Sequence, residues 1–455
     1  GIVDITGIGG DKLSPNLNMN INNMTMSAMA SLPIGKESAL MVAFRRTYYN
    51  LYDPEDINIS IFRNDQNTTD INTYPDYTFG DFNLKYAGSS EKHGDYYLSL
   101  YQGRDNFSYT VDQERTNVLV QQQAEEESRQ RGGSLNWSKQ WNNGLNSTIS
   151  TSYSDFSKDL SKSDKVSRII NQQQVFSREN NTKNGVNEVS INSHLSIPAL
   201  LGKFSGGLEY KYNSISFEES INNEFPIAIQ ANTGRMNGYI SQRSVVLKKI
   251  IIEPGLRVDL PLNLAQIYLQ PRLSVTAELN DGWKTYLAWG LYNQFISQSS
   301  VLDDYGNYQY FWALSVNIDV PVLQSVHNVG GLSYHNGLLT FSAEAYYKTT
   351  SGLTRYVSLL RENIKDVFEG NSRAYGLDLF MKRKFLKHEA WVSYSLSKTE
   401  EYFDYFPRLV FRDAPHDQRH EIKTAIILNF SPLYISANYV YGSGFINRSS
   451  FNSIV

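Results

Sequence analysis

The sequence predicts an all-β fold, an antiparallel transmembrane β-barrel with about 19 strands visible in the chain. Two observations predict this fold class. Apolar and polar residues alternate with a period of two along most of the 455 residues. The connections between these stretches are alternately short and long. Strands send successive side chains to opposite faces. Short turns on one rim and long loops on the other are typical of membrane barrels.

Composition excludes a helical membrane protein. Hydrophobic residues make up 41% of the chain and the mean hydropathy is −0.41. The longest uninterrupted apolar runs fall far short of the roughly 18 residues that a membrane helix needs. A barrel tolerates this composition because only one face of each strand meets lipid. The aromatic content of 13%, with 31 Tyr and 22 Phe, suits the aromatic girdles of such a wall.

Charge and cysteine content exclude other classes of function. The net charge of −4 gives no reason to expect a nucleic-acid partner. The chain has no cysteine, so a disulfide framework and a thiolate metal site are excluded. The first residues, Gly1–Thr6, contain neither a basic start nor an apolar signal core. Either a signal has been removed or the chain begins internally.

The alternation is clean in residues 204–213. Leu208 and Tyr210 fall on one face, and Glu209 and Lys211 on the other. We therefore expect the first set to contact lipid and the second to point inward. Residues 269–280, 338–348, 375–382 and 420–429 repeat the pattern.

Connection lengths separate a barrel from a soluble sandwich, which would also alternate but has no reason to sort its loops. The long, polar connections are expected on one rim as solvated loops, and residues 121–131, if helical, as a short exposed helix. One short connection, near residues 261–265, breaks the order. The other short connections are residues 33–37, 88–94, 141–144, 198–203, 247–249, 280–282, 335–337, 385–387 and 431–433. The long ones are residues 51–76, 107–132, 156–184, 218–234, 296–324, 351–371 and 403–415.

The strand count depends on the first alternating stretch. Residues 17–33 change phase near Asn22 and Asn23, which fits either a bulge in one strand or a tight turn between two. The turn gives about 19 strands, the last being residues 433–441. An odd number leaves the first and last strands with unpaired edges in lipid. We therefore expect that the chain does not close a barrel by itself.

Several short segments, in order along nearly the whole chain, resemble the barrel of the TonB-dependent outer-membrane receptors. Residues 1–7 (GIVDITG) resemble the last strand of the plug domain that fills the barrel in this family. The others are residues 33–36 (PIGK), 43–48 (AFRRTY), 270–274 (QPRLS), 286–294 (YLAWGLYNQ), 375–378 (YGLD), 391–394 (WVSY), 416–420 (HDQRH) and 441–444 (YGSG).

The resemblance implies an outer-membrane barrel of 22 strands in the intact protein, with long loops outside the cell. Residues 1–16 then form the end of the plug and the linker into the barrel, and residues 17–455 form a barrel that lacks its last three strands after Val455. The implied function is energy-coupled import of a bulky or scarce nutrient, such as a siderophore, cofactor, oligosaccharide or peptide. No enzyme activity and no cofactor are expected.

The implied partners are outer-membrane lipids and a TonB-type energy-coupling protein, reached through an N-terminal region ahead of Gly1. The resemblance also allows a surface lipoprotein partner. The alternative function is a passive porin or a barrel that scaffolds surface proteins. A plug upstream of Gly1 would favour active import over this alternative.

Two patterns with a chemical interpretation are weaker. His416 and His420, four residues apart, fit metal ligands or a polar loop that enters a strand, and we favour the loop. The charged residues Glu209, Lys211 and Glu344 fit a water-filled interior better than a catalytic carboxylate pair. We therefore predict no catalytic and no metal site.

Aromatic residues in the long connections are the candidate ligand surface, because they offer stacking faces to sugars, siderophores or haem-like rings. The alternative is an aromatic girdle with loop self-packing. The candidates are Tyr48, Tyr49, Tyr52, Tyr305, Tyr308, Tyr310, Phe311 and Trp312.

Overall fold

A computed structural model describes residues 7–48, 71–115, 117–200, 202–302, 308–315, 320–359, 364–406 and 410–445. The chain forms two compact units, each described here by itself. The first unit comprises Gly1–His194 and Glu209–Gly234. The second comprises Leu195–Leu208 and Arg235–Val455.

The described residues form 22 strands. Three of them, β14, β15 and β20, lie inside connections that the sequence assigns to loops, and the remaining nineteen match the nineteen predicted strands. The strands are β1 (Asn16–Ile21), β2 (Thr25–Ile34), β3 (Ser38–Thr47), β4 (Ile71–Ser90), β5 (Gly94–Arg115), β6 (Val118–Gln140), β7 (Asn146–Arg168), β8 (Gln174–Ala199), β9 (Gly202–Ile221), β10 (Glu224–Val246), β11 (Ile250–Pro261), β12 (Tyr268–Asn280), β13 (Trp283–Gln294), β14 (Ile296–Leu302), β15 (Tyr308–Leu314), β16 (Leu323–His335), β17 (Leu339–Leu359), β18 (Ile364–Phe385), β19 (His388–Phe403), β20 (Arg412–Asp413), β21 (His420–Asn429) and β22 (Tyr434–Gly442).

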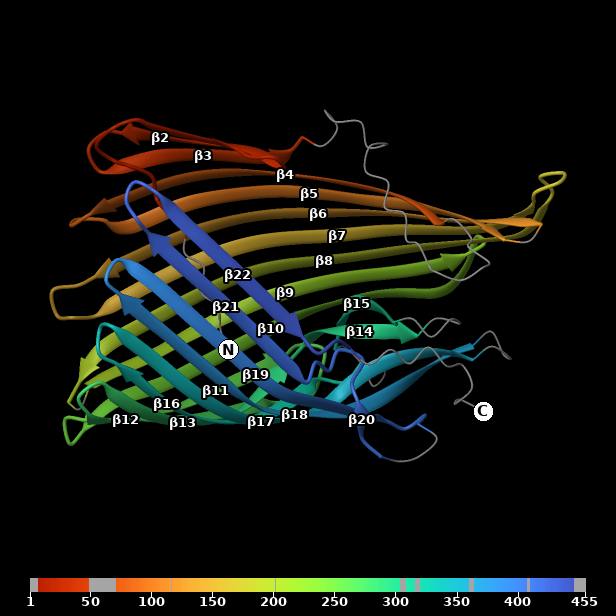
Figure 1. The fold of residues 1–455 in the computed structure, drawn as a ribbon. Helices are drawn as coiled ribbons and strands as arrows, with labels where there is room; N and C mark the ends of the chain where they lie inside the picture. Colours follow the sequence, from red (N-terminus) through yellow and green to blue (C-terminus); the bar gives the residue numbers. More distant parts are fainter. Residues whose placement is uncertain are drawn as a thin grey trace. The chain divides into compact units, whose positions relative to one another are not determined.

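The first unit is an antiparallel meander in which β1 to β7 pair in sequence order (Figure 1). The predicted phase change near Asn22 is a tight turn. The Asn22 side-chain oxygen accepts hydrogen bonds from the backbone N–H groups of Met24 and Thr25, both at 2.8 Å. A side chain that satisfies two backbone donors makes such a turn stable, so β1 and β2 are two strands.

The second unit continues the antiparallel pattern through β11, β12, β13 and β16 to β19, and then through β21 and β22. Between β13 and β16 the chain leaves the meander and forms the hairpin β14–β15. Strand β14 also pairs in parallel with β17, where Ser300 lies opposite Arg355. The predicted loop 296–324 is therefore partly a folded hairpin.

Each strand has an apolar face, called outward here, and a more polar face, called inward. On β9, outward Leu208 is 69% exposed, whereas inward Asn213 is 1% exposed. On β12, outward Leu269 is 53% exposed and inward Gln270 is 2% exposed. Apolar side chains left this open in a folded wall are suited to lipid rather than water.

The long connections differ from the prediction in one respect. The short turns are confirmed, and their end of the strands is called the turn end; the opposite end is the loop end. The predicted loops 107–132, 156–184 and 218–234 are instead strand continuations that end in tight turns, one of them at Asn222 and Asn223 with φ of 50° and 68°. Most of the predicted loop 351–371 likewise belongs to β17 and β18, which stay paired as far as Leu359 and Ile364.

The reason is cross-strand pairing. Residues 121–131, predicted as an exposed helix if helical, lie within β6 and pair with β5 and β7 without a break. Their side chains are mostly polar on both faces, so the sequence shows no alternation that would indicate a strand. The strand forms because β5 and β7 supply hydrogen-bond partners for its backbone N–H and C=O groups. In the described part of the chain no helix is long and apolar enough to cross a membrane. The expectation of three further strands after Val455 stays a prediction.

Candidate functional site

The candidate site lies at the loop end of the second unit, where β14 and β15 pack beside β17 and β19. It contains three of the aromatic residues that the sequence singles out. Arg355 lies on β17 sixteen residues beyond Leu339, the first residue of that strand at the turn end. About ten residues of a strand suffice to cross a bilayer. The site therefore lies beyond the segment that a membrane would cover.

Arg355 forms the centre of this site. Its two terminal nitrogens bond both carboxylate oxygens of Glu401, each at 3.0 Å. The same guanidinium donates to the Tyr405 hydroxyl at 2.8 Å and, through Nε, to the Ser300 hydroxyl at 3.1 Å. Both charged side chains are less than one tenth exposed. Bidentate geometry and two further acceptors compensate the cost of removing these charges from water.

Aromatic rings enclose the ion pair. The Arg355 guanidinium lies 4.0 Å from the Phe403 ring centroid, and Phe403 in turn contacts Phe406 and Tyr405. Phe311 from β15 packs on Tyr356 with ring centroids 5.4 Å apart. Through these rings and Arg355, residues of β15, β17 and 403–406 pack together in one cluster rather than forming independent loops.

Two hydroxyl groups in this site have no hydrogen-bond partner within the described residues. They belong to Ser299, which is 1% exposed, and Thr354, which is 6% exposed. Buried hydroxyl groups usually find a partner, and one left unpaired costs on the order of 1–3 kcal/mol. These positions are places where water or a ligand atom would gain a hydrogen bond.

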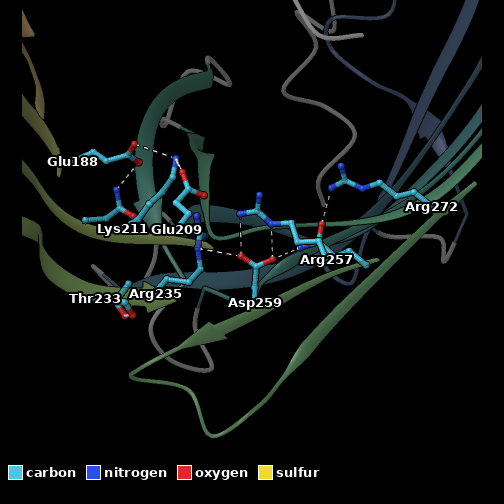
Figure 2. A network of polar contacts seen from close by, with 11 residues as sticks. Glu188, Glu209, Lys211, Thr233, Arg235, Arg257, Asp259 and Arg272 are labelled. Atoms are coloured by element: carbon cyan, nitrogen blue, oxygen red, sulfur yellow. Dashed lines mark hydrogen bonds and ion pairs between the residues drawn. The ribbon is translucent and has the colours of Figure 1, made fainter. Parts of the chain in front are cut away.

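The inward face of the second unit carries a separate polar cluster around Asp259 (Figure 2). Asp259 is 1% exposed and accepts hydrogen bonds from Arg257 Nε at 2.9 Å and Gln270 Nε2 at 2.5 Å. Arg235 approaches the same carboxylate at 3.4 Å, and its guanidinium stacks on Phe295. Arg272 bonds Gln270 at 3.2 Å and stacks on Tyr292. Two arginines contact this buried carboxylate and a third bonds its partner Gln270, so positive charge exceeds negative charge in this cluster.

The first unit has its own inward cluster, which contains the predicted pair Glu209 and Lys211 (Figure 2). Lys211 Nζ lies 3.3 Å from the Glu209 carboxylate and 3.2 Å from that of Glu188. Asn213 donates to the other Glu188 oxygen at 2.8 Å. The predicted neighbours are thus joined in an ion pair on the inward face. Paired carboxylates of this kind act as structural anions.

Comparison with solved structures establishes the fold. The pyoverdine outer membrane receptor FpvA of Pseudomonas aeruginosa superposes over 93% of this chain with a TM-score of 0.61 at 8% identity. The FrpB iron transporter of Neisseria meningitidis, in its apoprotein form, covers 91% with a TM-score of 0.60 at 11% identity. The RagAB peptide transporter covers 91% with a TM-score of 0.53 at 8% identity.

The chain has the fold of the TonB-dependent receptors. It spans 66%, 65% and 61% of the length of these three proteins, respectively. No protein-family model and no curated protein matches the sequence. The predicted class, an all-β transmembrane barrel of the outer-membrane type, is confirmed by the receptor fold.

The aromatic candidates fall in different places on this receptor fold. Tyr310 is 51% exposed, and Phe311 beside it is 2% exposed and packed against Tyr356. Trp312 is half-buried and shares the face of Tyr310, because alternate residues of a strand point the same way. Tyr310 and Trp312 therefore lie on one face of β15 and Phe311 on the other, which is packed against β17.

Tyr48 follows β3 in the first unit, and its hydroxyl donates to the Asn22 backbone oxygen. It thereby joins the end of β3 to the turn between β1 and β2. The side chains of Tyr49, Tyr52, Tyr305 and Tyr308 lie outside the part of the structure that is described. The ligand role of all eight aromatic residues stays a prediction.

Sequence reasoning missed Arg355, Glu401 and Tyr405. Glu401 and Tyr405 lie 46 and 50 positions beyond Arg355 along the chain. Arg355 and Tyr405 fall in two connections predicted as separate loops, and Glu401 lies just before the second of them. Their pairing depends on the folding of both connections against β14, which no local pattern encodes.

The two histidines do not share a ligand site among the described side chains. His416 is exposed, and His420 Nδ1 lies 2.9 Å from the Tyr394 hydroxyl. No group of three potential metal ligands occurs within the ranges that the structure describes. The favoured interpretation of residues 416–420 as a polar segment that enters strand β21 agrees with this placement.

Proposed function

We propose that this chain is the wall of an outer-membrane receptor that imports a bulky or scarce nutrient in a TonB-dependent manner. One observation carries the proposal, namely that the receptor fold extends over nine tenths of the chain in proteins described as siderophore, iron and peptide transporters. A siderophore, cofactor, oligosaccharide or peptide is the proposed substrate class. Coupling to TonB would run through the N-terminal region that precedes such barrels.

The loop-end cluster supports a binding role at the entrance. A packed cluster that carries the half-exposed Tyr310 needs little reorganisation when a ligand binds beside it, which favours affinity. The basic inward surface around Asp259 would then lie along the route of the ligand. An acidic or metal-chelating substrate fits that surface by charge.

Uptake in cells tests the proposal. A strain that lacks this protein should lose growth on one nutrient class among ferric siderophores, peptides and oligosaccharides offered as sole source. Growth should return with the wild-type gene and fail again when TonB is deleted. Growth that survives the TonB deletion, together with a steady ion current through the purified protein in planar bilayers, would support the passive porin instead.

A scaffold for surface proteins is the remaining candidate. Co-purification from detergent-solubilised outer membranes would identify a lipoprotein partner. A stable partner together with unimpaired growth on every nutrient class would favour the scaffold over the importer.

A further inference from the structure

The outward face of the first unit changes from apolar to charged residues toward the loop end of the strands. Unbroken registers across β3 to β7 arrange its outward residues in rows. The row of Val42, Leu84, Leu100, Gly133 and Tyr153 has no charged member. The next row is Phe44, Phe82, Gln102, Arg131 and Asp155, and the one after it is Arg46, Gly80, Arg104, Arg129 and Ser157.

Four arginines, here called the rim arginines, occupy the first two polar rows: Arg46, Arg104, Arg129 and Arg131. All four are exposed, with 58% and 48% of the Arg104 and Arg129 side chains open to solvent. An outward charge is costly at the bilayer midplane and nearly without cost at an interface. The rim arginines therefore mark the loop-end interface of the membrane.

The rim arginines are incompletely neutralised. Arg104 and Arg129 share the carboxylate of Glu127, at 2.7 and 2.5 Å. Arg46 and Arg131 have no hydrogen bond or ion pair with any described residue, although Asp155 lies opposite Arg131 in the register. The patch keeps an excess of positive charge, and the donors of two of its guanidinium groups are not used by any residue that the structure describes.

The corresponding level of the second unit differs. Arg373 and Lys398, outward residues next to the apolar face, both bond Glu400, at 2.6 and 2.8 Å. Their donors are used within the protein. The free donors in the first unit are thus a local feature and not a general property of the wall.

Charges farther from the apolar face have the opposite sign. Glu125, Asp159 and Glu218 line an outward hollow of about 450 Å³ with Lys183. An anion is therefore attracted to the rim arginines and repelled one to two rows beyond them. Only a group held at the level of the membrane surface meets the positive charge and the apolar rows together.

We propose that the rim arginines bind the phosphate groups of a phosphorylated glycolipid in the outer leaflet, whose acyl chains lie on the apolar rows below. Planar guanidinium groups match phosphate oxygens in bidentate geometry. The proposal rests on the loop end lying at the cell exterior, as the proposed function also assumes. It does not depend on any imported substrate. A failure of import would leave it standing.

The test uses the full chain purified in detergent and titrated with lipid A, in its phosphorylated and dephosphorylated forms, by native mass spectrometry. The double variant Arg46→Gln/Arg131→Gln removes only the two arginines without a described protein partner, so no carboxylate is left unpaired. The matched control is Lys183→Gln, which removes an outward charge on β8 beyond the boundary. A tryptic and thermal comparison checks that all variants fold.

The wild-type chain should prefer phosphorylated lipid A. Each basic residue near a charged membrane surface contributes roughly fivefold to affinity, so the double variant should bind phosphorylated lipid A about twenty-five-fold more weakly. Lys183→Gln should match the wild type, and dephosphorylated lipid should bind all three equally. Equal affinity of wild type and double variant for phosphorylated lipid, or no preference of the wild type for phosphate, would overturn the proposal.

Discussion

Arg355 on β17 and Glu401 on β19 form a bidentate ion pair, with both bonds at 3.0 Å. The pair is buried beneath aromatic rings and holds the β14 hairpin through Ser300. Buried pairs of this kind contribute less to stability than their Coulomb energy suggests, but breaking one is expensive. This relationship makes the loop-end cluster testable.

Glu401→Gln should destabilise the loop end of the second unit. The change leaves the Arg355 charge buried without a counter-ion, which costs about 3–5 kcal/mol. Hydrogen exchange should show faster opening of β14 and β15, while the exposed control Glu369→Gln leaves it unchanged. The double variant Arg355→Met/Glu401→Leu should recover most of the loss, since both charges are then gone. Unchanged exchange in Glu401→Gln would mean that the pair is not formed in solution.

Adjacent aromatic residues on β15 should separate binding from stability. Phe311→Ala empties a buried site and should cost about 3–5 kcal/mol of local stability. Tyr310→Ala and Trp312→Ala should leave the exchange of β15 nearly unchanged but weaken uptake of the nutrient identified in the growth test. Normal uptake by both variants would show that these rings do not bind the nutrient and would favour the alternative of an aromatic girdle.

A tyrosine on β13 reaches across a glycine on β16 to a carboxylate on β17. Tyr286 lies opposite Gly331, which lies opposite Glu344, and the Tyr286 hydroxyl donates to the Glu344 carboxylate. A Cβ at position 331 would approach the Tyr286 ring to 2.4 Å. Gly331→Ala should therefore turn the ring away and break that hydrogen bond.

Tyr286→Phe removes the same bond without the clash, and bonds to charged groups contribute about 1.5–3 kcal/mol. Both variants should unfold at lower temperature than the wild type, as measured by the shift between folded and unfolded bands after heating in detergent. Gly337→Ala, at a turn where an added Cβ meets nothing within 4 Å, is a control for space alone, although its φ of +84° adds backbone strain. If Tyr286→Phe unfolds at the wild-type temperature, the Tyr286 hydroxyl contributes nothing to stability.

The loop ends of β5 and β6 should weaken in acid. Hydrogen bonds from Arg129 and then Arg104 hold the pKa of Glu127 below its usual value. A carboxylate with a lowered folded-state pKa contributes stability above its unfolded pKa, near 4.3, and loses it as the pH falls through the folded value. Hydrogen exchange between pH 5 and pH 3 should show this loss in the wild type. Glu127→Gln should show no such step.

The two ends of the strands should lie on opposite sides of the membrane. The natural chain has no cysteine, so single introduced cysteines report without background. Replacements of Gln172 and Asn222 at loop-end turns should react with an impermeant maleimide on intact cells. Replacements of Lys36 and Asp281 at turn-end turns should react only after permeabilisation. Labelling of all four sites on intact cells would refute the proposed topology.

The sequence by itself determined the nineteen strands of the meander and the two faces of their membrane-spanning segments. Backbone geometry sends alternate side chains to opposite faces, so a period of two in residues such as Leu208 and Glu209 reports a strand between two environments. The phase change at Asn22 likewise encoded a turn, because a one-residue shift exchanges the faces. The fold class followed from these local rules.

Only the tertiary structure decided how the chain folds at the loop end, beyond the rows of residues that span the membrane. Toward the loop end of β9 the outward residues are polar, whereas inward Ile215 and Phe217 are apolar and only 3% and 1% exposed. The apolar and polar faces are therefore exchanged although the strand continues. The same holds for β6, whose polar loop end is a strand because β5 and β7 supply its hydrogen bonds. The Arg355 cluster and the rows of rim arginines arise from register between distant segments. Local sequence cannot encode them, because the partners that satisfy each charge and each backbone group are brought together only by folding.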